Sequence, residues 1–395
     1  MKRRNFLKAS TLASAAAFVP QFLQAFQAGR LENSRTGKIL VVVQLSGGND
    51  GLNTIVPYRN DRYYQLRPRL ALKPEEILPV SDELGFNPSL APLRELYDQG
   101  WMSIVNSVGY PNPDRSHFRS MDIWHTASGS DEYWSTGWLG RYLDHHCTGC
   151  PAHHALEIDS ALSLSMKGQD RTGFAMSNPQ QLQKTANNKF LQTLRDHDHH
   201  DEENVAYLYK TLIDTQSSAD YLAQRARRRR SRVKYPVSAF AKDLKQIAEL
   251  ITADCDTRIY YVSLTGFDTH ANQRNRQGRL LRQYAEGMAA FVKDLQQNNL
   301  LNDTLILTFS EFGRRAAQNA SNGTDHGTAN NLFLMGGKLQ TPGFFNAAPN
   351  LDRLDKKDLI YEIDFRQIYS TILDRWLDSD ADRIMGRDFQ RLALV

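Results

Sequence analysis

The chain is poor in several features that would assign it to a common protein class. It has three cysteines in 395 residues, so it lacks the second well-spaced pair that a structural zinc site would need. Its weakly apolar stretch from Ala9 to Val19 is too short and too rich in alanine and serine for a stable membrane span. The glycines of SGGNDGLNT fit neither the dinucleotide-binding pattern nor the phosphate loop, which excludes both motifs there.

A surplus of charge of one sign is also missing once the leader is set aside. The whole chain has a formal charge of +4, but residues 1–28 contain four lysines and arginines and no acid. Their removal brings the charge to about 0, so the composition gives no case for binding nucleic acid.

The leader itself predicts export. Residues 2–8, KRRNFLK, form a twin-arginine pattern, and small-residue cleavage sites follow at Ala25 or Ala28. We expect residues 1–28 to be a twin-arginine signal peptide, with the export machinery as a partner. The mature protein is then periplasmic or secreted and keeps no stable membrane span. Because this route carries folded proteins, it agrees with a metal that is loaded in the cytoplasm.

The remaining chain reads as an α/β protein. The chain is 41% hydrophobic and 23% charged, as in an ordinary soluble globule. Apolar runs of strand length alternate with helical patterns, and we expect strands at residues 38–45, 101–108, 258–264, 304–309 and 331–337. These predict one domain, 36–395, with a mostly parallel sheet flanked by helices. Residues 165–235 are polar and end in a basic run, which indicates a helical insertion.

Acidic and histidine side chains follow several of these strands. Open α/β sheets bind ligands beyond the carboxyl ends of their strands. Taken separately, Glu311 with Arg314 can be a simple ion pair, and Asp325-His326 a polar turn between glycines. Taken together, these groups predict one divalent cation at the sheet edge. Its expected ligands are Asp268, His270, Glu311 and His326, with Asp50 and Asp325 beside them.

The loop after the second strand carries Ser116 and His117. Ser116 opens a predicted helix, where backbone N–H groups stabilise an anion, so it is a candidate nucleophile with His117 beside it. The alternative, which the pattern favours, is that Ser116 caps the helix.

The cysteines allow two interpretations. Cys147 and Cys150, with histidines on both sides, have the look of a metal knuckle, but in an exported protein such a pair favours a local disulfide. Zinc binding and redox exchange stay as alternatives. Cys255 is expected to be free and buried beside the helix around Ile251.

These motifs resemble a known family. The leader, LSGGNDGLNTIVPY, DRSHFRSMDIWHT, GWLGRYLD, GFDTH, EFGR and GTDHG are similar to the domain of unknown function 1501 family over nearly the whole mature chain. DTLILTFSEFG and GTDHG are similar to metal-ligand motifs of the alkaline phosphatase and sulfatase superfamily. The resemblance implies an alkaline-phosphatase-like sheet with metal at the strand ends. It matches its ligands to Asp50, Asp268, His270, Glu311 and His326, although Phe312 stands where a second ligand often follows the carboxylate.

The resulting functional prediction is an exported metal-dependent hydrolase of phosphate or sulfate esters, small or polymeric. A cation (Zn²⁺, Mn²⁺ or Ca²⁺) would polarise an ester oxygen and lower the pKa of Ser116 or of a bound water, while Arg314 stabilises the added charge. The alternative is a periplasmic binding or assembly protein that keeps the fold without turnover.

Overall fold

A computed structural model describes residues 37–147, 149–186 and 203–395. The predicted signal peptide and residues 187–202 of the predicted insertion lie outside the described residues. Residues Lys38–Val395 form one compact unit.

A nine-stranded sheet forms the centre of this unit. Its strands lie in the order β11-β5-β10-β9-β1-β8-β6-β7, and β14 pairs with β5. The strands are β1 (Ile39–Ser46), β5 (Met102–Gly109), β6 (Ala155–Glu157), β7 (Phe174–Ala175), β8 (Ile259–Thr265), β9 (Thr304–Phe309), β10 (Asn330–Met335), β11 (Gly343–Phe344) and β14 (Ile363–Asp364). Pairing is parallel except that β10 is antiparallel to both β9 and β5. The mostly parallel α/β fold predicted from the sequence is therefore confirmed.

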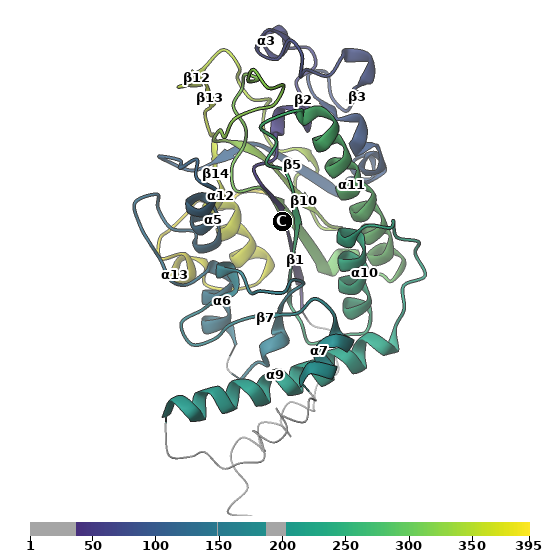
Figure 1. Ribbon diagram of the computed structural model, residues 1–395, viewed down its shortest axis with the longest axis vertical. Helices are drawn as coiled ribbons and strands as arrows, with labels where there is room; N and C mark the ends of the chain where they lie inside the picture. Colours follow the sequence, from purple (N-terminus) through teal and green to yellow (C-terminus); the bar gives the residue numbers. More distant parts are fainter. Residues whose placement is uncertain (1–36, 148, 187–202) are drawn as a thin grey trace, which may run out of the picture. The chain divides into compact units, whose positions relative to one another are not determined.

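Helices cover both faces of the sheet, which explains why the strands are continuously apolar. Successive residues of β1 point to opposite faces. Val41 and Val43 join a core with α10 (Ala239–Thr252) and α11 (Gln273–Gln297). Leu40 and Val42 join a second core on the other face. That core contains α5 (His117–Thr126), α6 (Trp138–His146), α12 (Phe365–Thr371) and α13 (Ala381–Met385), which Figure 1 shows across the sheet from α10 and α11.

Smaller elements complete the unit. A three-stranded sheet consists of β2 (Ile55–Val56), β3 (Leu78–Pro79) and β4 (Gly85–Phe86), and β12 (Leu354–Asp355) pairs with β13 (Asp358–Leu359). The remaining α-helices are α3 (Asp61–Leu66), α4 (Arg94–Asp98), α7 (Pro179–Ala186) and α9 (Glu203–Arg228). The last two lie in the stretch predicted to be a helical insertion, while β7, from the same stretch, adds an edge strand to the main sheet.

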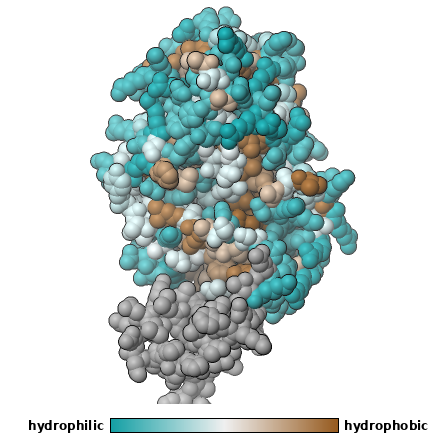
Figure 2. Space-filling model, viewed as in Figure 1, coloured by the Kyte–Doolittle hydropathy of each residue, from teal (hydrophilic) through white to brown (hydrophobic). Residues whose placement is uncertain are grey.

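No helix in the described part of the chain is long and apolar enough to cross a membrane. Figure 2 shows mostly hydrophilic side chains on the face that it draws, with apolar ones scattered between them. Cys147 and Cys150 form a disulfide, as predicted, and Cys255 is free. Cys255 is partly rather than fully buried and packs against the same core as Ile251.

Candidate metal centre

The carboxyl ends of β1, β8 and β9 lie at one edge of the sheet because the three strands are parallel neighbours. Asp268 and His270 follow β8, and Glu311 follows β9. His326 lies on the loop that leads to β10, and His117 begins α5. The fold thus brings together side chains that are more than 200 positions apart in the sequence.

Four atoms of these side chains converge. Oδ1 of Asp268 lies 3.0 Å from Nε2 of His270, 3.2 Å from Nε2 of His326 and 3.5 Å from Nε2 of His117. The Nε2 atoms of His270 and His326 are 2.9 Å apart. Ligand atoms bound tetrahedrally to a zinc-sized ion at about 2.0–2.1 Å are roughly 3.3 Å from one another. His117, Asp268 and His326 therefore offer ligand atoms within 4.8 Å of one another, which is the spacing of a metal-ligand set. Nε2 of His270 lies beside this set, next to Asp268 and His326.

Each of the three imidazole rings has an oxygen at its other nitrogen. Nδ1 of His117 lies 3.0 Å from Oε1 of Glu311, and Nδ1 of His326 lies 2.8 Å from the carbonyl oxygen of Arg115. Nδ1 of His270 lies 3.4 Å from Oδ1 of Asp325. In the tautomer that carries the proton on Nδ1, each ring donates to its oxygen and Nε2 presents a lone pair to the cluster. Metal-ligating histidines are oriented by such contacts.

Two buried atoms of the cluster have no hydrogen-bond partner, namely Nε2 of His117 and Oε2 of Glu311. A buried polar atom without a partner is costly, and a cation at the point of convergence would satisfy the imidazole nitrogen. The side chains of Asp268 and His270 are each 46% exposed, so the cluster opens to solvent. The residues present therefore fit a divalent metal ion with room for a further ligand.

Electrostatics keeps Asp268 ionised. Burial raises the pKa of this carboxyl, but hydrogen bonds with Arg314 and His326 and nearby positive charge outweigh it and lower the pKa to about 2. The hydrogen bond with Glu311 raises the pKa of His117 against the effect of burial. For His326 burial dominates and lowers the pKa. At neutral pH the cluster therefore contains the ionised carboxylate of Asp268.

Arg314 does not have the position that the sequence suggested for a substrate-contacting residue. Its side chain is fully buried and donates to Oδ1 of Asp268 at 2.8 Å. Its other donors go to the backbone carbonyls of Gly47, Gly48, Phe267 and Thr324. With its guanidinium engaged in this way, Arg314 holds three loops together and orients Asp268. We therefore regard it as a positioning residue.

Asp50 also lies apart from the converging atoms. Its two carboxylate oxygens accept from Nη1 and Nη2 of Arg67 at 2.6 and 3.0 Å, and Nε2 of Gln273 donates to the same carboxylate. Both side chains of the ion pair are buried. The carboxylate is saturated by these donors, which explains why Asp50 is not available to a metal. Arg67 follows no strand, and nothing in the sequence singled it out.

Glu311 and Asp325, expected as ligands, lie behind His117 and His270 rather than among the converging atoms. A hydrogen bond from Asn319 lowers the pKa of Asp325, with smaller effects from His270 and the positive charge of Arg315. His117, expected to take part in catalysis, instead supplies one of the converging nitrogens. Its place in the loop after β5, another strand end at this edge, is the sequence signal that would have grouped it with the ligands.

Ser116 lies at the N-cap position of α5, as its pattern predicted, but its side chain makes no capping hydrogen bond. Its backbone N–H donates to Oδ1 of Asp114 at 2.6 Å instead. The residue is exposed, so its hydroxyl is open to solvent directly beside His117.

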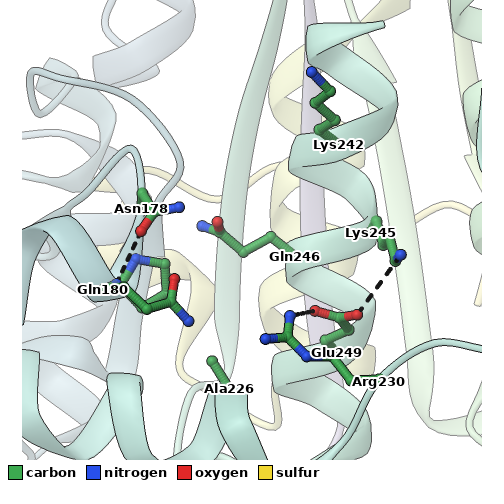
Figure 3. A pocket seen from close by; sticks show the side chains of 9 residues that line it. Asn178, Gln180, Ala226, Arg230, Lys242, Lys245, Gln246 and Glu249 are labelled. Carbon is green, nitrogen blue, oxygen red and sulfur yellow. Dashed lines mark hydrogen bonds and ion pairs between the residues drawn. The ribbon is translucent and has the colours of Figure 1, made fainter. Parts of the chain in front are cut away.

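Two other features of the described residues are separate from this cluster. His154 lies with Cys147 and Cys150 in a second group with metal-ligand spacing, but the disulfide removes both thiolates. A cavity of about 170 Å³ lies between α7, α9 and α10 (Figure 3). Arg230, Lys242, Lys245 and Glu249 are among its lining residues, and none of the histidines of the metal cluster is.

Comparison with known proteins identifies a family but no activity. The chain is similar to the crystal structure of Ps i-CgsB (10% identity, 90% of this chain and 75% of that chain, TM-score 0.43). It is also similar to a protein in the alkaline phosphatase superfamily from Vibrio parahaemolyticus (11%, 89% and 69%, TM-score 0.42). A third similar structure is the phosphonate monoester hydrolase SpPMH from Silicibacter pomeroyi (9%, 90% and 78%, TM-score 0.38). No curated protein matches the chain. The model of the DUF1501 family, described as a protein of unknown function, matches residues 101–391, and the chain therefore belongs to this family.

Proposed function

We propose that the protein is a divalent-metal-dependent hydrolase of phosphate or sulfate esters. The observation that carries this proposal is that His117, Asp268 and His326 offer ligand atoms within 4.8 Å of one another, with Nε2 of His270 beside Asp268 and His326. A protein gains little from gathering such ligand atoms around one point unless a cation binds there. The open side of the cluster leaves a coordination position for a reactant, as in catalytic rather than structural sites.

The donor set narrows the identity of the ion. Three nitrogens and one carboxylate oxygen suit Zn²⁺ or Mn²⁺, whereas Ca²⁺ prefers six to eight oxygen ligands. Such an ion, when bound, supplies Lewis-acid chemistry that polarises an ester and favours ionisation of a nucleophile. Asp268, oriented by Arg314, would fix the position of the ion. Ser116, exposed beside His117, is the side-chain candidate for the nucleophile, and water is the alternative.

One observation favours a second candidate function, a binding or assembly protein without turnover. Among the residues that the structure describes, no side-chain base is hydrogen-bonded to the hydroxyl of Ser116, and the side chain of Arg314 is fully buried. A site of this kind could hold an ion and an anionic ligand without activating a nucleophile.

The test uses the full chain, expressed with its leader and purified from the periplasm. Elemental analysis is expected to find one zinc or manganese ion per chain. Aryl phosphate monoesters, diesters and sulfates are then assayed before and after chelation and after metal is restored. Metal-dependent turnover would support the hydrolase. Stoichiometric metal without turnover would support the binding or assembly protein instead. The absence of bound metal would contradict the metal site on which both candidate functions rest.

Export is part of the proposal and rests on residues 2–8 of the leader. Changing Arg3 and Arg4 together to lysine is expected to hold the precursor in the cytoplasm, measured by fractionation and immunoblotting. Leader processing near Ala25 or Ala28 would be found by N-terminal sequencing of the periplasmic form. An unchanged periplasmic yield from the double variant would contradict the twin-arginine route.

A further inference from the structure

We infer that Arg115 and Arg315 bind the negatively charged oxygens of the substrate beside the metal centre, so that the substrate is an anionic ester. This inference rests on the proposed function and names the group that performs the role first expected of Arg314. Arg314 cannot reach a ligand, because its guanidinium is fully buried and each of its three nitrogens donates to a carbonyl oxygen or to Asp268. Other cations near the cluster must therefore supply the positive charge.

Both arginines belong to the segments that orient the imidazole ligands. The carbonyl of Arg115 accepts from Nδ1 of His326 at 2.8 Å. The backbone N–H of Arg315 donates to the carbonyl of Asp325 at 3.0 Å, and the carboxylate of Asp325 contacts His270. Arg115 thus contacts one histidine of the cluster directly, and Arg315 is connected to another through Asp325.

One buried carboxylate holds the two guanidinium groups together. Asp358 is 2% exposed in its side chain and forms an ion pair with Nη2 of Arg115. Its Oδ1 faces Nε of Arg315 across 3.9 Å, and both of these buried atoms lack a hydrogen-bond partner. One carboxylate between two guanidinium groups leaves a net charge of +1. Asp358 therefore orients the pair without cancelling it.

The two side chains remain accessible to a ligand. Arg115 is 37% and Arg315 31% exposed, in contrast to the fully buried Arg314. Within the described residues no hydrogen bond engages the guanidinium of Arg315, so its two Nη atoms can donate to a ligand while Nε faces Asp358. Guanidinium groups recognise phosphate and sulfate oxygens in this way, whereas a neutral ester would gain nothing from the uncompensated charge.

The experiment compares Arg315→Gln, Arg315→Lys and the native chain, all loaded with metal. Calorimetric titration with inorganic phosphate and with inorganic sulfate, at low and high salt, gives the dissociation constants, and elemental analysis gives the metal content. We expect Arg315→Gln to keep its metal, to weaken anion binding about tenfold and to raise KM more than it lowers kcat. Arg315→Lys should bind the anions more tightly than Arg315→Gln and less tightly than the native chain, because lysine keeps the positive charge but lacks the planar guanidinium that makes two parallel hydrogen bonds.

Two further variants make the result specific. Arg94→Gln is the matched control, because Arg94 is also half-exposed and ion-paired, with Asp98, but lies on α4 before the opposite end of β5. It should bind anions like the native chain. Arg115 is tested as Arg115→Gln with Asp358→Asn, since removing the arginine alone would leave a buried carboxylate unpaired. This double variant is also expected to lose anion affinity while keeping metal.

Failure of the inference differs from failure of the proposed function. If Arg315→Gln retains metal and binds both anions as tightly as the native chain, the inference is wrong and the metal centre stands. If the native chain binds no metal, the proposed function is wrong; a loss of phosphate binding in Arg315→Gln relative to the metal-free native chain would then still support the arginine pair.

Discussion

Two aspartate–arginine pairs lie near the carboxyl edge of the same sheet, and their surroundings differ. Arg67 and Arg314 are both fully buried, and each donates to its aspartate at less than 3 Å. Asp50, the partner of Arg67, is 1% exposed, and its carboxylate is taken up by Arg67 and Gln273. Asp268, the partner of Arg314, is 46% exposed, and its Oδ1 faces three imidazole nitrogens.

The comparison shows that the ion pair itself does not mark a functional site. Around Asp50 both carboxylate oxygens accept from buried donors of Arg67 and Gln273, so the network needs no ligand. Around Asp268 one carboxylate oxygen faces the Nε2 atoms of three histidines. Nε2 of His117 and Oε2 of Glu311 are buried there without a hydrogen-bond partner. Polar atoms left without partners therefore distinguish the candidate site from the structural network.

The largest effect is expected at Asp268, the half-exposed partner of Arg314. Asp268→Asn combined with His326→Ala should abolish metal binding, and turnover should fall roughly a thousandfold or more, because a catalytic ion supplies several kcal/mol of transition-state stabilisation. Elemental analysis and initial rates measure both effects. Because this variant leaves the fully buried guanidinium of Arg314 without its counter-charge, a loss of stability is also expected, and thermal unfolding without metal measures it. His145→Ala, at an exposed position on α6, is the control. Full metal content in the double variant would refute the site.

A change at the buried pair of Asp50 and Arg67 should lower stability but leave metal binding intact. Arg67→Gln leaves the carboxylate of Asp50 buried without its cation, which destabilises a protein by about 3–5 kcal/mol. Urea denaturation measures this loss in the free energy of unfolding, while the folded fraction should still bind metal stoichiometrically. A variant that loses metal at unchanged stability would mean that Asp50 and Arg67 belong to the metal centre after all.

The sequence predicts the sheet well because strand ends are local signals. The apolar runs at β1, β8 and β9 specify buried parallel strands, and their common edge follows from that pattern. From this alone Asp268, His270 and His326 can be grouped. The sequence also predicts the disulfide, because three residues of spacing bring Cys147 and Cys150 together whatever the rest of the fold does.

What each polar group does cannot be predicted in this way, because it depends on partners from distant segments. Asp50 and Asp268 both follow a strand in the sequence. Only the fold shows that Arg67 forms a buried ion pair with Asp50 and so keeps its carboxylate from a ligand. Glu311 follows its strand as a ligand would, yet it lies behind His117, from which 194 positions separate it. The antiparallel β10 separates β5 from β9, so β5 runs parallel to β1 without pairing with it.

A third carboxylate, Glu157 on β6, extends the comparison to an acid without a paired arginine. It is 4% exposed and accepts from the backbone N–H of Ser163 at 2.7 Å. Burial raises its pKa from 4.5 to about 7. A folded-state pKa above the unfolded value favours folding below pH 4.5, and this contribution is lost as the pH rises through about 7.

Glu157→Gln should therefore flatten the dependence of stability on pH between these two values. The glutamine has no charge to bury, so the variant should gain relative to the native chain as the pH rises, by at most about 3 kcal/mol. Urea denaturation at intervals from pH 4.5 to 8 measures the difference, with Asp50→Asn as the comparison at a carboxylate whose charge is compensated. Parallel curves for the native chain and Glu157→Gln would show that this carboxyl does not control the pH dependence.

The smallest predicted effect concerns Glu311, which the sequence indicated as a ligand and which the structure places behind one. Oε1 of Glu311 accepts from the backbone N–H of Gly47 at 2.8 Å as well as from Nδ1 of His117. In Glu311→Gln the amide oxygen can keep both contacts, so the change removes the charge and leaves the hydrogen bonds.

Without that charge the imidazole of His117 is less basic, and metal affinity should fall by about 10- to 100-fold, as for other residues that orient metal ligands. Competition with a chelator of known affinity measures the change, and circular dichroism checks the fold. If Oε2 of Glu311, which is buried without a partner, were itself a ligand, Glu311→Gln would lose metal as completely as is expected of the double variant Asp268→Asn with His326→Ala. The size of the loss therefore distinguishes a carboxylate that binds the ion from one that orients a histidine.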